Sequence, residues 1–147
     1  MLKLSEIPAG AVMACEIFAL FEHTGIYLGD ATITELAGSG LVRAVSPRRF
    51  LDGRSGEDIL VATDHQGNVL AEASAAKRAS EQIYSYQPYD LLRNNCHRFT
   101  YHCVTGLPEI ITSFYDLKVA LLSYYHSKQL LPRQQNAVQW RVVDCER

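Results

Sequence analysis

The stretch Leu91-Leu92-Arg93-Asn94-Asn95-Cys96-His97-Arg98-Phe99 decides how this chain is expected to fold. Residues 89–92 are predicted to form an extended, half-buried approach that the two asparagines interrupt. Beyond them, Phe99 and Cys103 are apolar residues at helical spacing, and Gly106-Leu107-Pro108 ends the pattern. The sequence therefore predicts a helix that begins inside the quoted stretch.

The start of this helix makes Cys96 a candidate nucleophile. Asn95 is a favourable N-cap residue, because its side-chain oxygen can accept a hydrogen bond from a backbone N–H of the first turn. The sulfur of Cys96 would then lie where the helix dipole favours a thiolate and where free N–H groups can receive an anionic oxygen. The alternative is that Cys96 is an inert, buried side chain, as most cysteines are.

The composition is that of an ordinary globular protein. The 147 residues are 48% hydrophobic and 20% charged, which predicts one domain over residues 1–147. A net charge of −2 gives no electrostatic reason to expect nucleic acid as a partner. The 4 cysteines are irregularly spaced and form no Cys-x-x-Cys pair, so neither a disulfide framework nor a metal is expected, and no motif suggests a cofactor.

The N-terminal residues do not have the pattern of a signal peptide, and no apolar run is long enough to cross a membrane. We therefore expect a cytoplasmic location, with contact at the periphery of a membrane left open. The residues 113–131 predict a helix packed on the domain or, alternatively, a lipid-facing or dimer-forming apolar stripe.

The apolar patterns predict an α+β fold, in which helices pack to one side of an antiparallel sheet. Strands and helices are expected at these positions: strands 11–21, 23–28, 31–36, 41–45, 59–63, 69–71 and 137–143, and helices 73–84, 95–106 and 113–131. Hairpins are expected to join 23–28 to 31–36 and 59–63 to 69–71, and residues 50–58 are expected to form a loop.

Any of the 5 histidines could serve as the base of Cys96. His97 and His102 share its helix, but position i+1 points about 100° away and i+6 lies on another face, so neither is expected to face the sulfur. Two more are expected to be exposed or half-buried, in a turn and on the late helix: His65 and His126. His23 opens a strand of apolar and small residues, an unusual place for a solvated histidine, and it is the candidate base.

Glu35 follows His23 by twelve residues, across the first predicted hairpin. If the loop holds an odd number of residues, such as Gly29-Asp30-Ala31, the two side chains share a face as near-diagonal neighbours, about 7–8 Å apart at the backbone. A carboxylate there would hold the imidazole in one tautomer and orientation, as the third group of a Ser/His/Asp-type site does. Glu22 would point to the opposite face. The alternative for Glu35 is an ordinary exposed residue of a strand.

Two motifs resemble the lecithin:retinol acyltransferase (LRAT)-like family: His23-Thr24-Gly25-Ile26-Tyr27-Leu28-Gly29-Asp30 and Asn94-Asn95-Cys96-His97-Arg98-Phe99. That family is a circularly permuted branch of the papain-like fold, related to NlpC-type cysteine peptidases, and the resemblance implies this fold. It covers residues 7–106, with residues 108–147 as a helix and strand extension outside it. It also implies that Cys96, His23 and Glu35 are the catalytic residues.

The chain departs from the family pattern at three positions of interest. It reads Cys96-His97-Arg98-Phe99 in place of Cys-Glu-His-Phe, and Glu35 stands where vertebrate members carry histidine. The resemblance implies acyl transfer or acyl hydrolysis through an acyl-cysteine thioester, with an acyl lipid such as a phospholipid as donor and an acceptor that it does not identify. Two alternatives stay open: a cysteine peptidase or amidase that uses the same site, and a catalytically inactive papain-like binding module.

Overall fold

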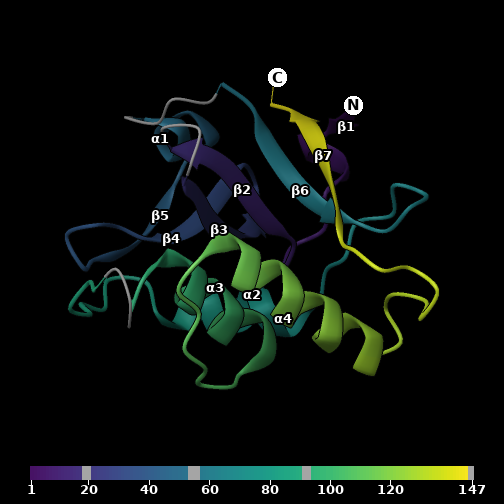
Figure 1. Ribbon diagram of the computed structural model, residues 1–147. Helices are drawn as coiled ribbons and strands as arrows, with labels where there is room; N and C mark the ends of the chain where they lie inside the picture. Colours follow the sequence, from purple (N-terminus) through teal and green to yellow (C-terminus); the bar gives the residue numbers. More distant parts are fainter. Residues whose placement is uncertain (18–20, 53–56, 91–93, 146–147) are drawn as a thin grey trace.

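The strand that carries the histidine motif lies inside a sheet that has seven strands in the described part of the chain (Figure 1). The spatial order of the strands is β1 (Leu2–Lys3), β7 (Gln139–Asp144), β6 (Ile59–Thr63), β2 (Val12–Ile17), β3 (Phe21–Gly29), β4 (Thr32–Leu36) and β5 (Val42–Val45). The computed structural model describes residues 1–17, 21–52, 57–90 and 94–145. Part of the predicted strand 11–21 and residues 91–92 of the predicted extended approach lie outside the described residues.

The α+β class is confirmed, but the sheet is mixed and not antiparallel throughout. β1 pairs parallel with β7, with Leu2 opposite Val143, whereas the other strand pairs are antiparallel. A strand of 2 residues is too short to leave a periodic pattern in the sequence. The 3-10 helix η1 (Leu4–Glu6) follows β1 directly.

The predicted hairpin between 59–63 and 69–71 forms only next to its turn, where Thr63 and Val69 form an antiparallel bridge and the backbone N–H of Leu70 donates to the carbonyl oxygen of Ala62. It does not extend into a strand pair. β6 pairs with β2 on one side and with β7 on the other, whereas Val69 and Ala71 form only isolated bridges, with Thr63 and Ala11. The partner strand β7 comes from the far end of the chain, so a reading of neighbouring residues could not identify it. As a consequence, the segment after residue 108 contributes a strand to the inside of the sheet.

The alternation of side chains along the strands divides the core between the two faces of the sheet. Three helices cover one face and lie together below the sheet in Figure 1: α2 (Ala73–Glu81), α3 (Cys96–Thr105) and α4 (Phe114–Ser127). Their core contains Ile26 of β3 and Leu36 of β4. On the opposite face, Phe50 packs with Met13 and Tyr27.

Phe50 belongs to a short helix, α1 (Pro47–Leu51), whose last residues fall where a loop was predicted. The signals for this helix are local. The side chain of Ser46 accepts a hydrogen bond from the backbone N–H of Arg49, and Pro47 occupies the first helical position. These signals place an aromatic ring over the sheet close to His23.

The apolar stripe of the late helix packs on the domain. Leu117, Leu121 and Tyr125 of α4 are buried within the core, so the lipid-facing or dimer-forming interpretation of this stripe is wrong. Among the helices of the described ranges, none combines the length and the apolar character that crossing a membrane requires.

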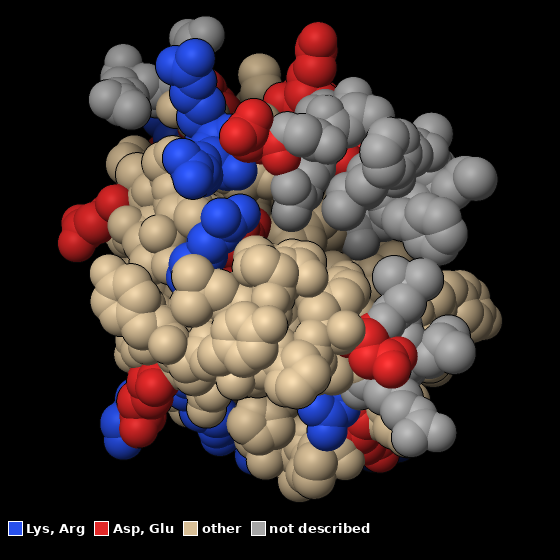
Figure 2. Space-filling model, turned by 90° about the vertical axis from the view of Figure 1, so that its left-hand side faces the viewer, with Lys and Arg blue, Asp and Glu red and all other residues tan. Residues whose placement is uncertain are grey.

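The surface on the left-hand side of Figure 1 faces the viewer in Figure 2. Basic side chains gather in its upper part, above a broad area without charged side chains. The segment 84–87 runs beside β5 through backbone hydrogen bonds that join Val42 to Ser85 and Gly40 to Gln87. Tyr84 and Tyr86 of this segment are exposed.

Candidate active site

Cys96 is the first residue of α3, and Asn95 caps the helix as predicted. The side-chain oxygen of Asn95 accepts hydrogen bonds from the backbone N–H groups of His97 at 2.9 Å and Arg98 at 3.0 Å. Its amide nitrogen donates to the carbonyl oxygen of Ile111 at 2.7 Å, which ties the helix start to the segment before α4. The side chain of Cys96 therefore lies at the positive end of the helix dipole.

His23 and Glu35 are in direct contact. The Nε2 atom of His23 lies 2.8 Å from Oε1 of Glu35, and both side chains are buried. With Nε2 engaged by the carboxylate, the imidazole is held in one orientation, and Nδ1 is the other ring nitrogen available for chemistry. Glu35 is thus no exposed strand residue, which excludes the alternative raised for it.

A β-bulge brings these two residues to the same face. Asp30 and Ala31 form a two-residue turn with positive φ angles of 48° and 54°. The register then shifts between Tyr27 and Gly29, so that one extra residue lies in β3. The turn and the bulge together give the odd count that the sequence prediction required. Without the bulge, the register of the turn would place Glu35 opposite Ile26, on the face away from His23.

Arg43 completes an ion-pair chain that the sequence analysis missed. Its Nε donates to Oε2 of Glu35 at 2.7 Å, and the two residues are direct cross-strand partners on β4 and β5. Burial raises the pKa of Glu35, but the hydrogen bonds and positive charges of His23 and Arg43 outweigh it and hold the pKa below its ordinary value. The carboxylate therefore stays ionised behind the imidazole.

Phe50 covers the other side of the imidazole. The ring centroids of His23 and Phe50 are 4.8 Å apart. Gly25, the next residue of β3 on this face, makes the close approach possible, because a Cβ there would lie 3.2 Å from the Phe50 ring and 2.5 Å from the carbonyl oxygen of Thr34. The glycine of the histidine motif thus serves the packing around His23.

His97 lies against Cys96, contrary to the prediction that it would face away. Its Nδ1 atom is 3.8 Å from Sγ of Cys96. The prediction considered only the 100° rotation between successive Cα–Cβ directions. At the first turn no preceding turn occupies the space beside the side chain, so a long ring can bend back towards its neighbour.

The thiol of Cys96 is biased towards ionisation. Burial alone raises its pKa, but hydrogen bonding and charge from His23 and His97 outweigh burial and hold the pKa well below its ordinary value. Cys103 on the same helix is different, because burial dominates there and raises its pKa to about 12. Of the two thiols on α3, Cys96 is the reactive one by this criterion.

The remaining histidines lie where the sequence placed them. His65 is exposed, and His126 is half-buried with Nε2 2.9 Å from the carbonyl oxygen of Gln135. His102 is also half-buried, and burial together with the charges of Arg98 and Arg78 lowers its pKa. The residues that the structure describes contain no cluster of three or more metal-ligating side chains.

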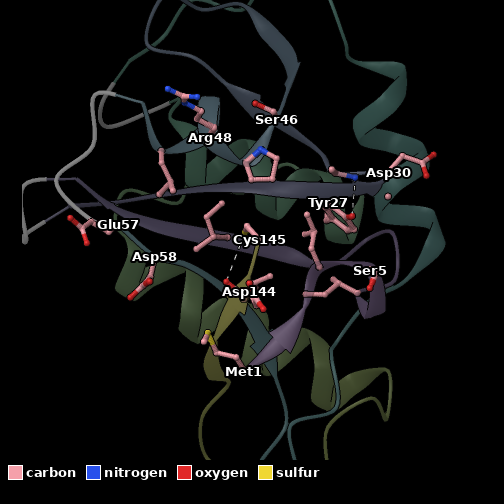
Figure 3. A pocket seen from close by; sticks show the side chains of 18 residues that line it. Met1, Ser5, Tyr27, Asp30, Ser46, Arg48, Glu57, Asp58, Asp144 and Cys145 are labelled. Atoms are coloured by element: carbon pink, nitrogen blue, oxygen red, sulfur yellow. Dashed lines mark hydrogen bonds between the residues drawn. The ribbon is translucent and has the colours of Figure 1, made fainter. Parts of the chain in front are cut away.

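A cavity of about 900 Å³ lies away from this site (Figure 3). Its wall includes Tyr27 of β3, Arg48 of α1 and Asp144 of β7. Cys96, His23 and Glu35 are not among the lining residues, and the wall carries charges of both signs. The cavity therefore takes no part in the arrangement around the thiol.

Replacing Glu35 with glutamine is expected to lower the free energy of unfolding by about 2 kcal/mol at neutral pH, because two buried, charge-assisted hydrogen bonds are weakened. Because the pKa of Glu35 is lowered in the folded state, the ionised carboxylate contributes its full stabilisation above the ordinary pKa of 4.5. This stabilisation is lost as the pH falls through the lower pKa of the folded state. The difference in the free energy of unfolding between the parent and the variant should therefore become smaller in acid. Urea denaturation at neutral pH and at about pH 4 measures it.

The matched control is Glu16→Gln, which changes an exposed carboxylate on β2. We expect its effect to stay within about 0.5 kcal/mol at both pH values. Equal effects of the two substitutions at neutral pH would mean that the contacts of Glu35 contribute nothing specific.

Comparison with known proteins adds independent information on this chain. Residues 5–109 match the family model described as lecithin retinol acyltransferase. A curated protein named lecithin retinol acyltransferase, from Rattus norvegicus, is 32% identical over 119 aligned residues, which cover 60% of this chain and 50% of the relative. The chain thus spans about half the length of the curated relative that it matches. The range matched by the family model contains Cys96, His23 and Glu35.

Proposed function

The chain belongs to the lecithin retinol acyltransferase family, and on this premise we propose that it transfers or hydrolyses an acyl group through a thioester on Cys96. The proposed donor is an acyl lipid such as a phospholipid. The acceptor is an alcohol, an amine or water. The observation that carries the proposal is a thiol with a lowered pKa at a helix N-terminus, next to a histidine that a buried carboxylate orients.

In the proposed first step, His23 takes the proton of Cys96 and the thiolate attacks the acyl carbonyl carbon. As the tetrahedral intermediate collapses, the imidazolium of His23 gives its proton to the leaving group, and the acyl group stays on sulfur. In the second step neutral His23 takes a proton from the acceptor, which attacks the thioester and releases Cys96. Glu35 stabilises the imidazolium in both steps.

The first turn of α3 offers a donor for the tetrahedral oxyanion. Asn95 already occupies the backbone N–H groups of His97 and Arg98. The N–H of Cys96 itself is therefore the group that we assign to the oxyanion. We also propose that the arrangement, with the nucleophile at the start of a helix packed on the strand of the histidine, is the circularly permuted papain-like fold of NlpC type.

The test is the mass of the intact protein after incubation with phospholipid and, separately, with a panel of peptides. An acyl adduct from phospholipid, located on Cys96 by fragmentation, supports the proposal. An adduct from peptides alone would support a peptidase or amidase that uses the same three residues. No adduct from either class, with release of product also absent, would contradict both.

One observation favours a second candidate, a binding module without catalysis. Cys96 is only 4% exposed, and a nucleophile must meet its substrate. Resistance of Cys96 to iodoacetamide in the native protein, together with rapid alkylation in urea, would support this candidate. Alkylation of the native protein near neutral pH would support the enzyme.

We propose that the two exposed tyrosines of the segment 84–87 bring the protein to the surface of a membrane where an acyl lipid is available. Tyr84 and Tyr86 are exposed aromatic residues, a type favoured at membrane interfaces. Flotation with phosphatidylcholine vesicles should recover the parent protein, and Tyr84→Ser combined with Tyr86→Ser should reduce recovery about threefold or more. Recovery unchanged by this double substitution would remove the two tyrosines from the proposal, and Tyr115→Ser, at an exposed position of α4, is the matched control.

A further inference from the structure

A buried polar cluster joins the strand of the base to the helix of the nucleophile. Oγ1 of Thr24 on β3 lies 3.1 Å from Nδ1 of His97 and 3.0 Å from Oγ1 of Thr100 on α3. The same hydroxyl donates to the carbonyl oxygen of Cys96 at 3.5 Å. Thr24, His97 and Thr100 are all buried. The cluster therefore fixes the first turn of α3 against the strand next to His23.

The hydrogen bonds that the Thr24 hydroxyl can make decide the tautomer of the His97 imidazole. A hydroxyl has one proton to donate and two lone pairs that accept. If Thr24 donates towards Thr100 or the carbonyl oxygen of Cys96, it accepts from His97. In that arrangement Nδ1 of His97 carries a proton, and this nitrogen is also the one 3.8 Å from Sγ of Cys96.

We propose that His97 is a second histidine of the nucleophile's site. Its one Nδ1–H proton is shared between Oγ1 of Thr24, which together with Thr100 holds the ring in that tautomer, and the thiolate of Cys96. This inference rests on the proposed function for its catalytic meaning. The thiolate then has two imidazole partners with different tasks. His23, oriented by Glu35, exchanges protons with the substrates, whereas His97 keeps its proton and stabilises the sulfur anion.

This division of tasks has a consequence for the pH dependence. A neutral donor to the thiolate lowers the pH at which the thiol ionises without changing the proton exchange of His23. Within the described ranges, the charged or titratable groups near the cluster include His23 on β3, with Glu35 and Arg43 behind it, and Lys118 on α4. The amine of Lys118 lies over the ring of Phe114, which in turn contacts the ring of His97.

The experiment measures the rate of iodoacetamide alkylation of Cys96 against pH in the parent and in His97→Phe. Removing the donor should raise the midpoint of this rate–pH profile by about one pH unit. At pH values below the midpoints of both proteins, alkylation should be about tenfold slower in the variant. His97→Asn, whose amide nitrogen can occupy the place of Nδ1, should bring the midpoint most of the way back. The ultraviolet absorbance of the thiolate, corrected with Cys96→Ser, reports the same midpoint if alkylation is slow.

Two threonine variants test the tautomer. Thr24→Val removes the hydroxyl and should raise the midpoint, whereas Thr24→Ser keeps the hydroxyl and should not. His102→Gln, on the same helix, is the control for a general disturbance of α3, and it should leave the midpoint in place. A midpoint that stays constant in His97→Phe, or that rises equally in His102→Gln, would overturn the proposal.

The outcome is separable from that of the proposed function, because alkylation needs no acyl donor. A raised midpoint in His97→Phe without any acyl adduct in the parent would keep the role of His97 and reject acyl transfer. An acyl adduct in the parent with an unmoved midpoint would keep acyl transfer and reject the role of His97.

Discussion

Replacing Cys96 with serine is expected to abolish the acyl adduct and to reduce turnover about ten-thousand-fold or more. The two histidines beside Cys96 favour a thiolate, but a serine hydroxyl ionises at far higher pH and the same partners cannot convert it into an anion at rest. Turnover of a phospholipid donor and the mass of the intact protein measure the two effects. Because the serine side chain is only slightly smaller than that of cysteine, circular dichroism should show an unchanged fold.

Cys103→Ser is the control for this substitution. Cys103 lies on the same helix but is fully buried in the core, and its pKa is raised to about 12. We expect this variant to keep the acyl adduct, with a loss of stability of about 1 kcal/mol from the buried hydroxyl. An adduct that persists in Cys96→Ser and disappears in Cys103→Ser would show that Cys103, and not Cys96, is the nucleophile.

The parts of the site that the sequence could predict depend on neighbouring residues in the chain. The helix of Cys96 begins at its N-cap residue Asn95 and ends at Gly106, which has a φ angle of 75°. Both are local signals, in which a side chain satisfies the first N–H groups or a glycine accepts a left-handed conformation. The predicted strands around His23 and Glu35 likewise rest on the alternation within each segment.

The contact between His23 and Glu35 shows where local signals end. The two side chains share a face only if the loop holds an odd number of residues, and the structure reaches this count by a two-residue turn and a bulge at Leu28. A turn of the same sequence without the bulge would separate the two side chains. Register depends on the packing of the whole hairpin, which a single sequence does not show.

Arg43 and His97 were missed for two different reasons. Arg43 approaches Glu35 because β4 and β5 pair in a particular register, so the contact depends on tertiary structure. His97 approaches Cys96 because its ring is long and lies at the open end of a helix, and there the direction of Cα–Cβ alone does not decide what the ring contacts. The parallel pairing of β1 with β7 is again tertiary, since it joins the two ends of the chain.

Replacing His23 with alanine is expected to reduce turnover about a thousandfold or more, because the variant loses both the base for Cys96 and the proton donor for the leaving group. Alkylation of Cys96 near neutral pH should also slow. The loss should be smaller for alkylation than for turnover, since His97 still contacts the sulfur and alkylation requires no proton transfer to a leaving group.

The double substitution His23→Ala with His97→Phe separates these contributions. If both rings stabilise the thiolate, alkylation should slow further in the double variant, whereas turnover should fall little below that of His23→Ala, because the proton transfers are already lost. His65→Ala, at an exposed turn, is the matched histidine control and should leave both rates unchanged. Equal alkylation rates in the parent and in His23→Ala would contradict the pairing of His23 with the thiolate, and with it the proposed first step.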